Sequence, residues 1–150
     1  MDRVPESTVD ELLQWIAYER DAAWAAKLAV LRASGLRDIA HFGVCVREHE
    51  RHAEELAQLV RAVDRRRAIP TEPVFVTRDP FVVGDLDDGR AVLRAVADLE
   101  RARIARYEER RRGYSVLDAL LERHLHDARA RLSSLEDLRA AGGAPREAAA

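Results

Sequence analysis

The stretch from Cys45 to Leu56, which reads CVREHERHAEEL, decides how the chain is interpreted. It lies within an apolar stripe at helical spacing, formed by Ile39, Phe42, Val46, Ala53, Leu56, Val60 and Val63. The gaps in this stripe are 3, 4, 7, 3, 4 and 3 residues, so one position is skipped, and that position is His49. His52 follows three residues later, and residues three apart share a helix face. Two imidazoles are therefore predicted to face whatever this helix packs against.

The composition places this helix in an all-α protein of one domain. The chain has 150 residues, 47% of them hydrophobic and 35% charged, with much Ala, Leu, Glu and Arg at helical spacing. The net charge of −2 gives no electrostatic basis for binding nucleic acid or an anionic membrane. We therefore expect neither as a partner.

Cysteine and lysine usage indicate a compartment and a source. Cys45 is the only cysteine, which excludes an intramolecular disulfide and is typical of a reducing compartment. The first residues contain no apolar signal region, and no stretch approaches the roughly 20 apolar residues of a membrane span. We expect a cytoplasmic protein. Lys27 is the only lysine, which favours a bacterial source with GC-rich codons.

Apolar periodicity and helix-stop residues divide the chain into four helices, at about 8–34, 37–66, 87–112 and 115–141. The first two are separated by a very short turn, so they are predicted to be antiparallel. Residues 142–150 form a short Ala-rich tail that we expect to be disordered.

Residues 67–86 connect the second helix to the third. Pro70, Pro73, Pro80 and Gly84 oppose a continuous helix, and Phe81-Val82-Val83 is predicted to be extended. An extended segment of this length reaches roughly 60 Å, whereas a helix of the first helix's length spans about 40 Å. The connection is thus long enough to run the length of the bundle, with its valines and phenylalanines gripping the side. The predicted architecture is a four-helix bundle with one long crossover between helices 2 and 3.

Polar residues lie in the apolar stripe of the first three helices, and beside the stripe of the fourth, near each helix midpoint. They are Glu19, His49, His52, Glu100, His124 and Asp127. A buried carboxylate or imidazole without a partner costs several kcal/mol, so four such interruptions at one height indicate a shared polar site. Carboxylates and neutral imidazoles are ligands for Fe, Mn or Zn. These six residues are the candidate metal ligands.

This arrangement resembles the ferritin-like superfamily, which includes rubrerythrins and bacterioferritins. In that family a Glu from helices 1 and 3 and a Glu-x-x-His from helices 2 and 4 hold two metal ions. The stretch around His49 and His52 resembles the second-helix motif, with His52 at the family's His, and Glu19 and Glu100 match the single glutamates. The resemblance implies a metal-binding protein with a di-iron or di-manganese site of the oxidoreductase type.

Two departures from the family motif leave other readings open. His49 stands where the family has Glu, with Glu48 one residue away, and in helix 4 Ala128 and Arg131 occupy the family's ligand positions. Arg103 or Arg131 could instead pair with Glu100 or Glu19 and replace the metal. The alternative is then a metal-free bundle, with no cofactor, that serves as a structural or protein-interaction module. A hemerythrin-like oxygen binder is disfavoured by the histidine spacings, and enzymatic activity is left open.

Apolar residues outside the predicted core favour a homodimer. Trp15 and Trp24 lie beside the first helix's stripe, and the crossover is apolar. We expect two copies to pair side by side through these residues. The ferritin cage is disfavoured, since the sequence has no fifth long helix.

Overall fold

The computed structural model describes residues 5–110, 112–113 and 115–143, in which the secondary structure consists of helices without strands, and this confirms the predicted all-α class. Four long helices and one short one occur in this range. They are α1 (Glu6–Arg32), α2 (Leu36–Val63), α3 (Asp79–Gly84), α4 (Gly89–Glu109) and α5 (Ser115–Gly143). The boundaries differ from the sequence expectation by a few residues. α5 extends through Gly143, and residues 144–150 of the predicted tail lie outside the described residues.

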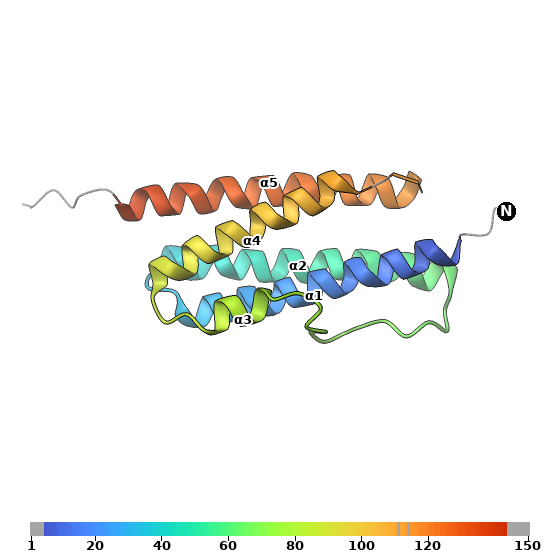
Figure 1. Ribbon diagram of the computed structural model, residues 1–150, viewed down its shortest axis with the longest axis horizontal. Coiled ribbons are helices and arrows are strands. Elements are labelled where there is room, and N and C mark those ends of the chain that lie inside the picture. The colour runs from blue at the N-terminus through green and yellow to red at the C-terminus, as the bar shows by residue number, and fades with distance from the viewer. Residues whose placement is uncertain (1–4, 111, 114, 144–150) are drawn as a thin grey trace, which may run out of the picture.

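The long helices form two antiparallel hairpins (Figure 1). α1 packs mainly on α2 across a turn at residues 33–35, and α4 packs mainly on α5. The segment after α2 runs back along the molecule, so that α4 runs in the same direction as α2. Gly89 permits the start of α4 to approach the α1–α2 turn, because a Cβ there would lie 2.6 Å from Ser34 Oγ.

The segment between α2 and α4 is not extended throughout. The prediction for Phe81-Val82-Val83 was wrong, because these residues belong to the short helix α3. Pro80 lies in the first turn of α3, where a missing backbone N–H leaves no helical hydrogen bond unmade. Val83 is fully buried against Phe42 and other apolar side chains, so tertiary packing sets the conformation here.

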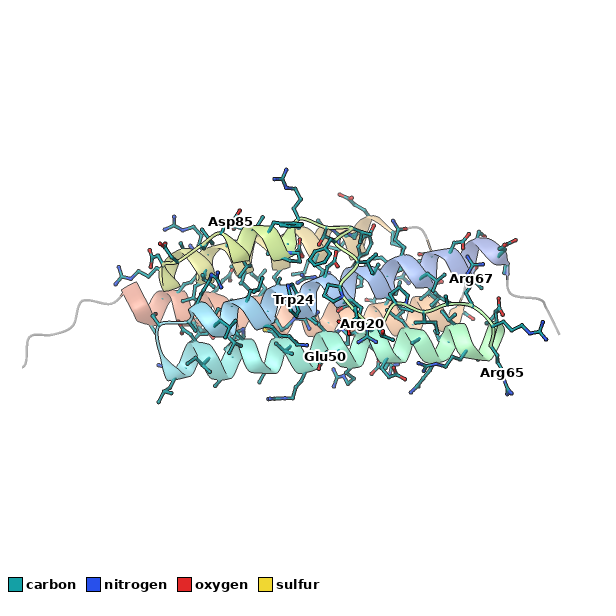
Figure 2. All side chains as sticks on the ribbon, turned by 90° about the horizontal axis from the view of Figure 1, so that it is seen from below. Arg20, Trp24, Glu50, Arg65, Arg67 and Asp85 are labelled. Atoms are coloured by element: carbon teal, nitrogen blue, oxygen red, sulfur yellow. The ribbon has the colours of Figure 1, made fainter. Side chains whose placement is uncertain are left out.

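Asp21 holds the preceding part of this segment on α1. The buried Asp21 carboxylate accepts backbone N–H groups from Val74, Phe75 and Thr77 at 2.8–2.9 Å. Phe75 adopts a φ of 59°, which is unusual for a residue other than glycine. Val74, Phe75 and Val76 are 43–54% exposed, so the expectation that they grip the bundle was wrong. A polar anchor performs that task, and Figure 2 shows the segment beside the labelled Arg20 and Trp24 of α1.

The core consists of two apolar clusters separated along the helix axes. One lies towards the α1 N-terminus and includes Leu12, Ile16, Leu56 and Leu121, while the other includes Phe42. Trp15 is only 5% exposed and stacks on Tyr107 in the first cluster, so it does not contribute to a partner surface as expected. The polar layer lies between the two clusters.

None of the helices in the described part of the chain has the length and apolar character needed to span a membrane.

Candidate metal centre

The structure places the six candidate ligands at the level between the two apolar clusters. Glu19 comes from α1, His49 and His52 from α2, Glu100 from α4, and His124 and Asp127 from α5. All except Asp127 are at most 2% exposed. The side chain of Asp127 is 30% exposed and lies at the edge of the layer. A polar layer contributed by four helices is therefore present.

Three of these residues meet closely enough to share one ion. Glu19, His52 and His124 each offer a ligand atom, and these atoms all lie within 4.8 Å of one another. The His52 and His124 rings are stacked, with centroids 3.7 Å apart. The cluster thus combines two imidazoles and one carboxylate from three different helices.

Two neighbours fix the Glu19 carboxylate. Tyr107 donates its hydroxyl to Oε1 at 2.7 Å, and His49 Nδ1 lies 2.6 Å from Oε2. An ionised carboxylate only accepts hydrogen bonds, so Nδ1 of His49 carries the hydrogen. His49 therefore supports Glu19 with its Nδ1 and does not present that nitrogen to the cluster.

The outer nitrogens of the stacked histidines are also bound to carboxylates. His52 Nε2 donates to Asp127 Oδ2 at 2.8 Å, and His124 Nε2 donates to Glu55 Oε2 at 2.9 Å. The inner nitrogens, Nδ1 of His52 and of His124, are buried and have no hydrogen-bond partner among the described residues. His52 Nδ1 lies 3.7 Å from Glu19 Oε2, too far for a hydrogen bond.

The environment shifts the pKa of each group in this cluster. Burial by itself would raise the pKa of Glu19, but His49 and His52 outweigh it and hold that pKa well below the usual range. Burial, together with the neighbouring His52, lowers the pKa of His124 to about 4. Burial would also lower the pKa of His52, but Glu19 and Asp127 raise it. At neutral pH, Glu19 is therefore ionised and His124 is neutral, as metal ligands must be.

Glu100 belongs to a second cluster. Its Oε2 accepts from Arg103 at 2.7 Å, and its Oε1 accepts from Arg131 at 2.9 Å. Arg131 also donates to Glu48 at 2.6 Å, and Arg103 donates to Asp79 of α3 at 3.0 Å. Both oxygens of Glu100 are thus engaged by buried guanidinium groups.

This second cluster contains Glu48 and Arg131, two of the residues at which the sequence departs from the ferritin-like motif. Glu48 faces Arg131 and not the histidines, so it does not act as the missing second-helix glutamate. Ala128 packs in the apolar core. The pairing with arginine that the sequence left open therefore occurs at Glu100, whereas the neighbours of Glu19 include His49 and His52.

Sequence reasoning missed Glu55 and Asp79. Glu55 lies three residues after His52, on the same helix face, so its support of the neighbouring His124 had a signal in the spacing. The pairing of Asp79 with Arg103 had no signal in the sequence, because it depends on where α3 packs.

The donor set fits a transition metal ion. Two imidazoles, which bind metal in their neutral form, and a carboxylate suit Zn²⁺, Fe²⁺ or Mn²⁺. Histidine ligands typically donate their second N–H to a carboxylate, which orients the ring, and both stacked histidines do so here. Because a buried polar atom without a partner is costly, an ion between Glu19 and the two Nδ1 atoms would remove an energetic penalty.

Comparison with known proteins adds no assignment: no protein-family model, curated protein or solved structure matches the chain.

Proposed function

We propose that this protein binds one divalent transition metal ion at the centre of its helices, held by Glu19, His52 and His124. The observation that carries this proposal is the pair of buried, unpartnered Nδ1 atoms beside the Glu19 carboxylate. Fe or Mn remains the proposed metal, with Zn as a further fit to two imidazoles and a carboxylate.

Each neighbouring side chain has a part in holding these ligands. Asp127 and Glu55 accept the Nε2 hydrogens of His52 and His124, which orients the two rings and leaves their Nδ1 atoms for the metal ion. Tyr107 and His49 hold the Glu19 carboxylate, one at each oxygen. An ion held by three protein ligands would have open positions and would supply Lewis-acid chemistry, or one-electron chemistry in the case of Fe or Mn, to a small molecule such as oxygen or peroxide.

We infer further that the chain is a remote relative of the ferritin-like superfamily, a four-helix bundle with a long crossover. The direction of α4 relative to α2 supports this. The family's site holds two ions, but we propose one here, because both oxygens of Glu100 accept from Arg103 and Arg131. Two guanidinium groups at that position would repel a second dication.

Metal titration tests the proposal. Calorimetric titration of metal-free protein with Fe(II), Mn(II) or Zn(II), under anaerobic conditions for iron, is expected to give one equivalent. His52→Ala and His124→Ala should each abolish metal binding. His126 is exposed and lies on α5 like His124, so His126→Ala should leave metal binding unchanged. At a free metal concentration of 100 times Kd, binding of the ion should add about 2.7 kcal/mol to the free energy of unfolding. Two equivalents that both require Glu100 would instead establish a dinuclear site.

The second candidate is a metal-free structural or interaction module, and the arginine cluster favours it. Glu48, Glu100, Arg103, Arg131 and Asp79 form a buried ion-pair network that involves α2, α3, α4 and α5. Such a network fixes helix register without any ligand. No bound metal and no change in melting temperature in the titration would select this candidate.

We also propose that two copies pair through exposed apolar residues of α1, α3 and the connection between α2 and α3. These residues are Trp24, Val74, Phe75, Val76, Phe81 and Val82, which are 39–54% exposed. Phe75 and Phe81 contact each other, with ring centroids 5.5 Å apart. Sedimentation equilibrium is expected to give a dimer mass for the wild type and a monomer mass for Phe75→Ser/Phe81→Ser. A monomeric wild type would exclude the pairing.

A further inference from the structure

The surface between α2 and α5 is hollowed directly outside the proposed metal site. This hollow has a volume of about 720 Å³, and its lining includes Arg51, Glu55, His124 and Asp127. Exposure falls steeply across it, from 56% for the Arg51 side chain, through 32% for Glu55 and 30% for Asp127, to 1% for His124. The hollow therefore leads from solvent, past two carboxylates, to a buried ring.

Arg51 lies across both carboxylates. It donates to Asp127 Oδ2 at 3.0 Å, and its Nε lies 3.6 Å from Glu55 Oε1. The same two carboxylates accept the Nε2 hydrogens of His52 and His124. One exposed arginine thus closes the outer side of the carboxylate pair that supports both stacked histidines.

We propose that Glu55 and Asp127 form the access site through which a divalent cation reaches the buried histidines, and that Arg51 is a latch over it. Partly exposed carboxylates attract a dication, and the two histidine rings that these carboxylates bind carry the buried, unpartnered Nδ1 atoms. The ion pairs of Arg51 are solvent-exposed and hence weak, so the latch opens readily. This inference rests on the proposed metal site and concerns the rate of exchange, whereas that proposal concerns stoichiometry.

A latch and a simple positive charge have different kinetic consequences. A latch raises the energy barrier for both entry and exit of the metal ion. Its removal therefore speeds both uptake and release and leaves the affinity for the ion nearly unchanged. A positive charge near the site repels the cation, so its removal speeds uptake and slows release. The ratio of the two rate changes separates these roles.

Two other arginines provide matched controls. Arg129 lines the same hollow but pairs with Glu108, so Arg129→Ala removes the same charge without touching the latch. Arg61 lies on α2 like Arg51, is 51% exposed and pairs with Glu54, outside the hollow. Arg61→Ala therefore controls for loss of an exposed ion pair on the same helix.

The experiment uses Co(II) alone as the probe. Stopped-flow absorbance follows Co(II) uptake by metal-free protein, and a second mix with excess EDTA follows release. In Arg51→Ala we expect both rates to rise about fivefold, which corresponds to about 1 kcal/mol of lost ion pairing. Arg51→Lys should lie between wild type and Arg51→Ala. The uptake and release rates of Arg61→Ala should match those of wild type. Arg129→Ala should show at most the effect of a lost positive charge, which is faster uptake with slower release.

Several results would overturn the latch. One is unchanged rates in Arg51→Ala with one equivalent of Co(II) still bound. Another is faster uptake with slower release in Arg51→Ala, which would show that Arg51 acts only through its positive charge. Loss of stoichiometric binding in a variant with wild-type helical circular dichroism would make Arg51 a structural support of the ligands. If wild type itself binds no Co(II), the proposed metal site falls and the latch falls with it.

Discussion

The imidazole rings of His52 and His124 are stacked, with their planes inclined by 13° and their centroids 3.7 Å apart. Two protonated rings at this distance would repel each other strongly, so the pair carries at most one charge. Burial and His52 lower the pKa of His124 to about 4, so His124 is the neutral ring at physiological pH. The stack therefore keeps at least one imidazole in the neutral form that binds metal.

Arg131 is expected to matter for stability more than any exposed arginine. Arg131→Met should reduce the free energy of unfolding by about 3 kcal/mol, because it leaves the buried Glu100 and part-buried Glu48 without one of their partners. Urea denaturation measures this loss. Arg129→Met, which removes only an exposed pair with Glu108, should cost less than about 1 kcal/mol. Equal effects of the two substitutions would contradict the buried network.

Acid should weaken the arginine cluster in a defined direction. Burial would raise the pKa of Glu100, but Arg103 and Arg131 outweigh it and keep that pKa below the usual range. A carboxyl group whose folded pKa is depressed adds stability above its unfolded pKa of about 4.3, and this stability is lost as the pH falls through the folded pKa. Glu100→Gln should therefore be clearly less stable than wild type at pH 7. Urea midpoints at pH 7, 5, 4 and 3 should show this gap narrowing, and a constant gap would argue against an ionised Glu100.

Asp21 is expected to hold the α2–α4 connection in place. Asp21→Ala leaves three backbone N–H groups without their acceptor, with an expected cost of about 2 kcal/mol in the free energy of unfolding. In this variant, amide hydrogen exchange should accelerate more at Val74, Phe75 and Thr77 than in the four long helices. Chymotrypsin should also cleave after Phe75 faster than in wild type. Asp98→Ala, which removes only an exposed pair with Arg101, is the control and should change neither readout.

Cys45 is expected to be chemically inert in the folded protein. Burial is the largest factor that raises the pKa of its thiol to about 12, and only 2% of the residue is exposed. Because the thiolate is the reactive form, iodoacetamide at pH 8 should modify Cys45 very slowly in native protein and quickly in 8 M urea. Mass spectrometry over time measures both rates. Fast modification of the native protein would show that this part of α2 opens.

The sequence by itself determined the four long helices and the level of the polar layer. Apolar spacing is a local property, and each interruption lies at a fixed rise along its own helix, so Glu19, His52, Glu100 and His124 were assigned to one height without coordinates. Tertiary structure decided which groups meet in that layer. Whether Glu100 faces histidines or arginines depends on the rotation of α4 against α5, and spacing along one helix contains no information about that angle. The helix α3 and the Asp21 anchor were likewise decided by contacts between residues more than forty positions apart, where packing outweighs local preference.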